Sequence, residues 1–181
     1  MNTLQQPEIS GLKLFQPIIF QDARGYFFES YNCETFKKLG IDDVFVQDNQ
    51  SFSKKNVIRG LHFQAPPFAQ AKLVRVVKGA VLDVAVDLRK NSPTYGQHFS
   101  VELNEENQLQ FYIPVGFAHG FAVLEENTIF AYKCSNIYHK DSERTILFND
   151  NDLNINWKVK NPIVTEKDLQ GVCFKDFVSP Y

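Results

Sequence analysis

Short hydrophobic stretches recur at regular intervals along most of the chain. Seven of them lie between Val44 and Trp157, each about five to eight residues long and rich in the Val, Ile, Phe and Tyr that favour strands. They cover residues 57–64, 71–77, 81–88, 97–103, 108–113, 120–124 and 128–134, with Pro, Gly or Asn turns between them. No helical periodicity separates them, so the pattern predicts an antiparallel sandwich or barrel.

The two ends of the chain carry weaker signals. Apolar stretches at 11–20 and 26–31 are separated by a turn at 21–25. Asn32 is a suitable N-cap for a short helix over 33–39 that ends at Gly40, and a turn or short helix is expected at 165–169. We therefore predict one all-β domain, 1–181, with an N-terminal arm and short helix (1–43), a barrel core (44–157) and a C-terminal extension (158–181).

Composition supports this fold class and excludes several partners. The chain has 181 residues, of which 44% are hydrophobic and 22% charged, which is typical of a globular domain. Aromatic residues reach 14%, including 17 Phe and 7 Tyr, and this favours β-structure. The formal charge is −2 and no basic run is present, so we expect no nucleic-acid partner and no binding to an anionic membrane.

The location of the protein is predicted from similar evidence. The first ten residues are polar, and no apolar run approaches the roughly 20 residues that span a bilayer. The three cysteines (Cys33, Cys134 and Cys173) are too few for a disulfide scaffold. We expect no membrane association and a cytoplasmic protein.

Candidate chemistry begins in the stretch 59–64. Alternation along a strand places His62 and Gln64 on one face and Leu61 and Phe63 on the other. In a closed barrel the polar face would look into the lumen, where Lys72 of the next strand would join His62. The alternative is that His62 is an ordinary sheet histidine with no catalytic role.

Two further residues deserve a place among the candidates. The turn 113–121 delivers His119 into an apolar strand and resembles the second cupin motif. A metal-binding cupin would also need a His-x-His pair and a glutamate, but here Gln64 and Lys72 take those places, so no metal is predicted. Tyr132 is a possible acid or, alternatively, a buried tyrosine bonded to the backbone. No glycine-rich phosphate loop is present, and no cofactor is expected.

Several segments in one order carry a more specific resemblance. They are 47–51, 57–64, 69–76, 83–89, 92–96, 114–121 and Tyr132-Lys133, with Glu143 downstream. Together they resemble the dTDP-4-dehydrorhamnose 3,5-epimerase family over about residues 11–168. This resemblance implies a metal-independent, cupin-type jelly-roll β-barrel that works as a homodimer. It also implies inversion of C3 and C5 of dTDP-4-dehydro-6-deoxy-D-glucose.

The resemblance also implies roles for individual residues. It makes His62 the general base, Tyr132 the acid, Asp168 the carboxylate that orients the base, and Lys72 the cation at the C4 oxygen. Tyr138 would stack on the thymine, and Arg24 and Glu29 of the N-terminal arm would reach the partner subunit's site. The implied substrate contacts are Arg24, Glu29, Gln47, Asp48, Asn49, Arg59, Lys72, His119, Tyr138, Glu143 and Lys167.

The chemistry of these side chains suits that reaction. A ketone at C4 acidifies the C3 and C5 hydrogens, and a histidine with a pKa of about 6.5 is a suitable base at neutral pH. A lysine would stabilise the enolate. Three alternatives remain open: a mono-epimerase acting at C3 or C5 alone, a metal-dependent cupin oxygenase or isomerase, and a catalytically silent sugar-nucleotide binding module.

Overall fold

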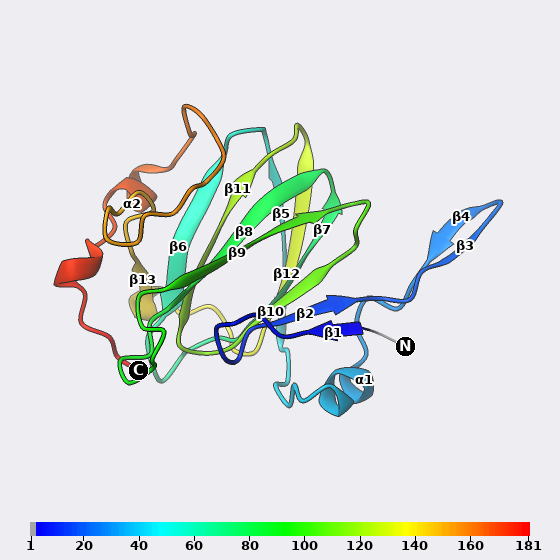
Figure 1. Ribbon diagram of the computed structural model, residues 1–181, viewed down its shortest axis with the longest axis horizontal. Coiled ribbons are helices and arrows are strands. Elements are labelled where there is room, and N and C mark those ends of the chain that lie inside the picture. Colours follow the sequence, from blue (N-terminus) through cyan, green and yellow to red (C-terminus); the bar gives the residue numbers. More distant parts are fainter. Residues whose placement is uncertain (1–2) are drawn as a thin grey trace.

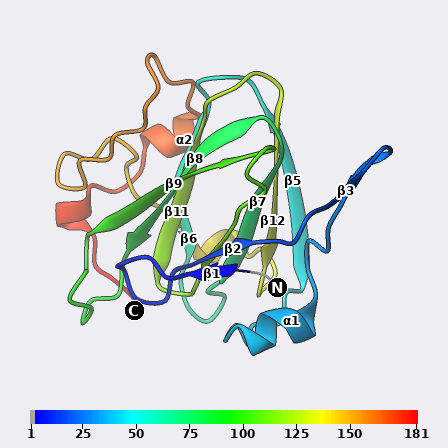
Figure 2. The same cartoon turned by 45° about the vertical axis from the view of Figure 1, so that its right-hand side comes forward.

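Two antiparallel sheets face each other and form a barrel (Figures 1 and 2). The computed structural model describes residues 3–181, with side chains from residue 5 onward, so residues 1–2 of the predicted N-terminal part lie outside it. The six-stranded sheet has the order β1 (Thr3–Gln5), β2 (Lys13–Gln16), β10 (Gln110–Ile113), β7 (Lys72–Lys78), β12 (Thr128–Cys134) and β5 (Gln47–Ser53). The five-stranded sheet has the order β13 (Glu143–Thr145), β6 (Ile58–Gln64), β11 (Phe117–Val123), β8 (Ala80–Asp87) and β9 (His98–Asn104).

The predicted all-β class and the seven central strands are confirmed. Most of their boundaries agree to within two residues, and the largest difference is that β11 begins at Phe117 and not at Gly120. The turn before it ends at Gly116, whose φ of +98° suits glycine, and every residue of β11 after it is buried. Strands β1, β5 and β13 were not among the predicted ones.

Hydrophobic side chains fill the space between the two sheets. Val74 and Val76 from β7 meet Phe121 from β11 and Phe130 from β12 in this lumen. Alternation therefore turns Lys72, which shares a face with Val74, towards the same interior. The polar cavity described below lies in the same lumen and shares Phe121 with this core.

A second apolar layer covers the outer face of the five-stranded sheet. Leu61 and Phe63 of β6 point into it, as the alternation predicted, and pack with Ile146 and Trp157. The C-terminal extension, drawn in orange and red in Figure 1, adds Val164, Phe174, Phe177 and Tyr181 to this layer. It contains the short helix α2 (Glu166–Leu169) and the 3-10 helix η2 (Phe174–Asp176). The extension thus brings α2 beside β6.

The N-terminal part is only partly an arm. Its first strands, β1 and β2, belong to the six-stranded sheet. Helix α1 (Cys33–Lys38) begins at the predicted cap, where Asn32 accepts from the backbone N–H groups of Glu34 and Thr35. The hairpin of β3 (Phe20–Asp22) and β4 (Gly25–Phe27) projects away from the barrel (Figure 1). None of the helices in residues 3–181 has the length and apolar character needed to cross a membrane.

Candidate active site

A polar cavity lies between the two sheets, beside strands β5 and β6. Side chains from both sheets line it: His62 from β6, Lys72 from β7 and Tyr132 from β12. The cavity has a volume of about 300 Å³, and a smaller one of about 130 Å³ shares these three residues. The lining of the larger cavity also includes Ser51, Arg59, His119, Phe121, Thr165, Lys167 and Asp168. The structure therefore places His62 and Lys72 together in the lumen, as predicted.

His62 is held by a buried carboxylate. Its Nε2 lies 2.5 Å from Oδ1 of Asp168, whose exposed fraction is 2%. Burial acts to raise the pKa of Asp168, but the hydrogen bond and charge of His62 outweigh it, and the pKa lies below its ordinary value. The carboxylate stays ionised and fixes the orientation of the imidazole, and no side chain from residue 5 onward bonds to its Nδ1.

Local structure explains how Asp168 reaches His62. Thr165 caps α2 by accepting from the Asp168 backbone N–H, which places Asp168 in the first turn of that short helix. The segment before it is anchored by a parallel bridge between Ile163 and Val57. The backbone N–H of Gly60 donates to Asp168 Oδ2 at 3.4 Å, so the carboxylate is bonded to β6 at two points.

Lys72 and Tyr132 lie together on the opposite wall. Lys72 Nζ is 6.0 Å from the centre of the Tyr132 ring. Burial lowers the pKa of Lys72 and raises the pKa of Tyr132. Among the described residues, the Tyr132 hydroxyl forms no hydrogen bond with a backbone group. The alternative interpretation, a buried tyrosine bonded to the backbone, required such a bond.

A second histidine–carboxylate pair lies deeper in the cavity. His119 Nε2 is 3.0 Å from both carboxylate oxygens of Asp83, which is fully buried on β8. Burial lowers the pKa of His119, and the Asp83 charge opposes this shift. The sequence reasoning gave Asp83 no role. The signal that could have identified it is a carboxylate with three apolar residues on either side in β8.

Polar side chains form a network at the mouth of the smaller cavity. Glu143 pairs with Lys167 at 2.5 Å and accepts a hydrogen bond from the Tyr138 hydroxyl at 2.9 Å. Gln47 Oε1 accepts from the Tyr138 backbone N–H at 2.7 Å, and Gln47 Nε2 donates to Asn49. These five residues, all predicted to contact substrate, are thus brought together around one opening.

Gln64 has a supporting position. Its side-chain amide donates to the carbonyls of Phe68 and Ile137, and its oxygen accepts from the His139 backbone N–H. All these bonds hold the loops beside Tyr138. The Gln64 amide is therefore engaged with protein groups. No group of three or more His, Cys, Asp and Glu side chains within residues 3–181 is placed to hold a metal ion.

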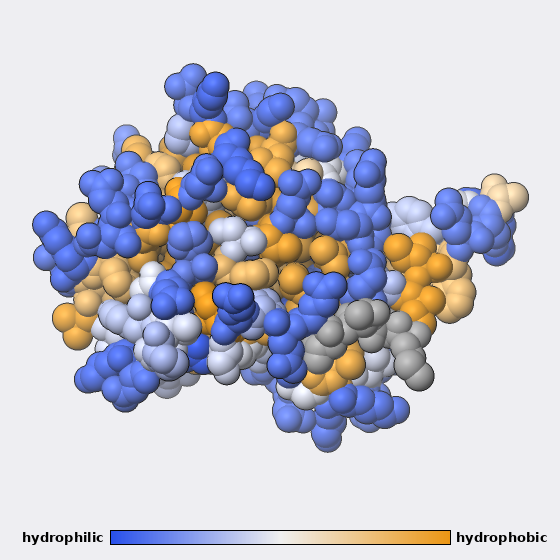
Figure 3. All heavy atoms as spheres, viewed as in Figure 1, coloured by the Kyte–Doolittle hydropathy of each residue, from blue (hydrophilic) through white to orange (hydrophobic). Residues whose placement is uncertain are grey.

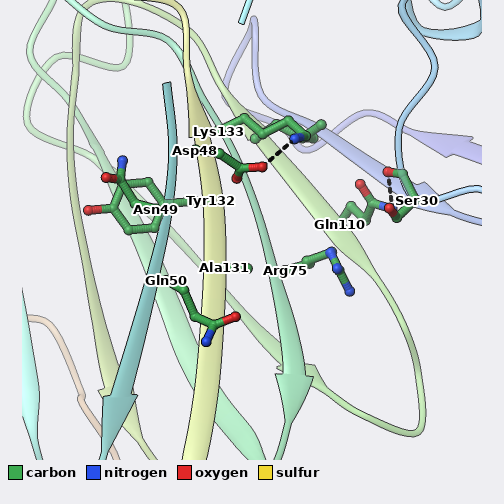
Figure 4. A pocket seen from close by; sticks show the side chains of 10 residues that line it. Ser30, Asp48, Asn49, Gln50, Arg75, Gln110, Ala131, Tyr132 and Lys133 are labelled. Atoms are coloured by element: carbon green, nitrogen blue, oxygen red, sulfur yellow. Dashed lines mark hydrogen bonds and ion pairs between the residues drawn. The ribbon is translucent and has the colours of Figure 1, made fainter. Parts of the chain in front are cut away.

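Three predicted contacts lie away from the cavity. Asp48 points to the outer face of β5, where it pairs with Lys133 at 2.7 Å, while Asn49 and Tyr132 point the other way (Figure 4). Arg24 is in the projecting hairpin, with 90% of its side chain exposed, and pairs with Asp22. Glu29, at the base of the hairpin, accepts from Asn32. Within one chain these three residues do not meet His62.

The barrel and its central cavity define a cupin-type protein whose lumen presents a histidine–aspartate pair, a lysine and a tyrosine. A family model described as dTDP-4-dehydrorhamnose 3,5-epimerase matches residues 6–176. The chain belongs to the dTDP-4-dehydrorhamnose 3,5-epimerase family and is an isomerase. The predicted family is thereby confirmed.

Individual relatives agree with this assignment. A dTDP-4-dehydrorhamnose 3,5-epimerase from Shigella flexneri is 50% identical over 177 residues, which is 97% of each chain. The crystal structure of the enzyme of that name from Elizabethkingia anophelis has a TM-score of 0.92 at 49% identity and covers 97% of both chains. A Legionella pneumophila dTDP-6-deoxy-D-glucose-3,5-epimerase, solved in complex with dTDP-4-keto-L-rhamnose, has a TM-score of 0.95 at 44% identity and covers 98% of this chain and 95% of its own.

Proposed function

We propose that this isomerase inverts C3 and C5 of dTDP-4-dehydro-6-deoxy-D-glucose, with His62 as the base and Tyr132 as the acid. One observation carries the proposal: the buried Asp168 lies 2.5 Å from His62, and Lys72 and Tyr132 line the same cavity. His62 and Tyr132 come from opposite sheets. A sugar ring between them would have the base on one face and the acid on the other.

The proposed reaction proceeds through an enolate at each centre. Nδ1 of His62 takes the proton from C3, and the electrons of the C–H bond form a C3–C4 double bond while C4 oxygen becomes negative. The Lys72 ammonium stabilises that oxygen. Tyr132 then gives its proton to the other face of C3, where the electrons of the C3–C4 double bond form the new C–H bond and the C4 carbonyl is restored. His62 releases the abstracted proton to solvent, and the Tyr132 phenolate takes up a proton from solvent, so both groups return to their starting states. The same sequence at C5 completes the product.

The remaining cavity residues bind and orient the sugar nucleotide. Arg59 is suited to a phosphate group because its guanidinium presents several donors in one plane. His119, kept in place by Asp83, faces the sugar from the floor of the cavity. Tyr138 stacks on the thymine at the mouth, where Gln47, Asn49, Glu143 and Lys167 supply polar contacts.

A homodimer would complete the site. The β3–β4 hairpin exposes Phe20, Tyr26 and Phe27 by 62%, 58% and 69%, and Figure 3 shows hydrophobic surface on this projection and at its base. Exposed apolar surface of this kind marks an interaction site. A groove of about 280 Å³, lined by Asp48, Arg75, Gln110 and Lys133, lies on the outer face of β5, β12 and β7 (Figure 4). In the proposed dimer the hairpin carries Arg24 and Glu29 to the partner's cavity, and Asp48 belongs to the same interface.

The oxidation state of the cysteines gives evidence about the cellular compartment of the protein. Cys33, Cys134 and Cys173 are all free thiols. Free thiols suit a reducing compartment, which supports the proposal of a cytoplasmic enzyme.

Proton NMR in deuterated water tests the reaction. We expect the C3 and C5 signals of dTDP-4-dehydro-6-deoxy-D-glucose to disappear with the purified protein, and to persist with His62→Ala while dTDP binding remains. Exchange at one carbon alone would identify a mono-epimerase. Binding without exchange in the wild-type protein would identify a silent binding module. Activity lost to a chelator and restored by Fe, Mn or Zn would identify a metal-dependent cupin.

A further inference from the structure

The hydroxyl of Ser51 is buried in the wall of the catalytic cavity without a hydrogen-bond partner. No other buried side-chain nitrogen or oxygen is left unpaired among the side chains that the structure describes. Ser51 lies on β5 opposite Phe130 of β12, whose ring packs in the lumen. It shares its strand face with Asn49 and Ser53, which are two residues away on either side.

An unpaired buried hydroxyl opposes folding, because it gives up its hydrogen bonds to water and gains none in return. Such a group is expected to have a partner when the protein is at work. A serine side chain rotates between staggered positions about its Cα–Cβ bond, so Ser51 can turn its hydroxyl to the cavity when an acceptor arrives there.

The neighbouring arginine indicates what that acceptor is. Arg59 uses its Nε and Nη2 to donate to Ser53 Oγ, each at 3.2 Å. No carboxylate pairs with Arg59 among the described residues. A guanidinium has five N–H donors, so several remain for a ligand on the wall that also holds Ser51. A half-buried cation beside an unsatisfied hydroxyl donor fits a phosphate group.

We propose that Ser51 is a further substrate-binding residue, whose hydroxyl donates to an oxygen of the sugar-linked phosphate while Arg59 binds the same phosphate. This inference rests on the proposed function, because it requires a sugar nucleotide as the substrate. It differs from a structural role for Ser51, since the hydroxyl has nothing to hold in the ligand-free protein.

Comparing the binding of two nucleotides isolates the contribution of the sugar-linked phosphate. dTDP contains this second phosphate and dTMP lacks it. Isothermal titration should show that Ser51→Ala weakens dTDP binding about tenfold, the effect of one hydrogen bond to a charged group, and leaves dTMP binding unchanged. Ser51→Cys keeps the side-chain volume with a weak donor and should behave in the same way. Ser100→Ala, on an exposed position of β9, is the matched control and should change neither affinity.

Thermal unfolding of the ligand-free variants completes the test. Because Ser51→Ala removes an unsatisfied polar group, its Tm should equal or exceed that of the wild-type protein. A lower Tm with an unchanged dTDP-to-dTMP affinity ratio would show a structural role and overturn the inference. Equal losses for dTDP and dTMP would overturn the phosphate assignment. Proton exchange by the wild-type protein is measured separately, so failure of the proposed reaction is distinguishable from failure of the Ser51 assignment.

Discussion

Burial shifts the pKa values of Lys72 and Tyr132 in opposite directions, and this separates their roles. A charged ammonium is disfavoured in the cavity, so the pKa of Lys72 falls; a charged phenolate is disfavoured too, so the pKa of Tyr132 rises. The pH range in which Lys72 is charged therefore ends at a lower pH than for a solvated lysine. Tyr132 keeps the proton that an acid needs to a higher pH than a solvated tyrosine does.

We predict that Lys72 sets the alkaline limit of activity. A neutral lysine cannot stabilise the enolate oxygen, so kcat/KM should decline at a pH below the ordinary lysine value of about 10.4. In Lys72→Arg the guanidinium remains charged, and the decline should move to higher pH even if the rate is lower throughout. Normalised pH–rate profiles of the two proteins measure this. Coincident alkaline limbs would contradict the assignment.

A second prediction concerns the carboxylate behind the base. Asp168→Asn preserves the size of the side chain but lets an amide N–H face Nε2, which favours the wrong tautomer of His62. Proton exchange at C3 should fall on the order of 10²- to 10⁴-fold, by analogy with the triad aspartate. dTDP affinity should remain within about twofold, because Asp168 positions the base and does not bind the nucleotide. Glu166→Gln, exposed on the same helix, is the control. Equal rates of proton exchange in Asp168→Asn and Glu166→Gln would show that Asp168 has no part in the mechanism.

Strand β5 shows why part of the site could not be predicted from hydrophobic alternation. Six of its seven residues are polar, since one face lines the catalytic cavity and the other forms the outer groove. Its identity as a strand comes from pairing with β12 in unbroken register from Ser53–Thr128 to Gln47–Cys134. The central strands were predictable because their apolar faces are buried. The sequence places His62 on a lumen face but, apart from the family resemblance, does not bring Asp168 to it across a separation of 106 residues.

The close approach of the paired strands β6 and β11 at Gly60 and Gly120 leads to a prediction about stability. A Cβ at Gly60 would lie 2.5 Å from Gly120 Cα, and Gly60 has a φ of +137°, so any side chain there is both strained and crowded. Gly60→Ala should lower the free energy of unfolding by about 3 kcal/mol or more. Gly40→Ala is the matched control: its φ is +75°, but its Cβ would meet only the flexible end of Lys13, and about 1 kcal/mol is expected. Urea unfolding at one protomer concentration measures both, and equal losses would show that the close approach contributes nothing.

The β3–β4 hairpin projects from the barrel of its own chain, to which it is bonded where Gln108 Nε2 donates to the Tyr26 hydroxyl. Its aromatic side chains are exposed, and Arg24 has no neighbour from the cavity. A monomer of 20.8 kDa would leave these groups in solvent. We expect light scattering to give about twice that mass, as for a twofold dimer. The double variant Phe20→Ser, Phe27→Ser should shift the mass towards the monomer by removing apolar contact area. An unchanged monomer mass for the wild-type protein would contradict this.

Mixing two inactive variants would show which subunit each hairpin serves. Arg24→Ala removes the hairpin cation but keeps the base, and His62→Ala does the reverse. If the hairpin acts on the partner's cavity, a heterodimer of the two has one intact site, formed by His62 of one subunit and Arg24 of the other. Random reassociation of equal amounts makes half of the dimers heterodimers, each with one of two sites active, so about one quarter of wild-type activity should return. If the hairpin instead served its own chain, every site would lack either Arg24 or His62. In that case mixing would restore nothing beyond the residual rate of Arg24→Ala, and the proposed exchange of arms between subunits would be wrong.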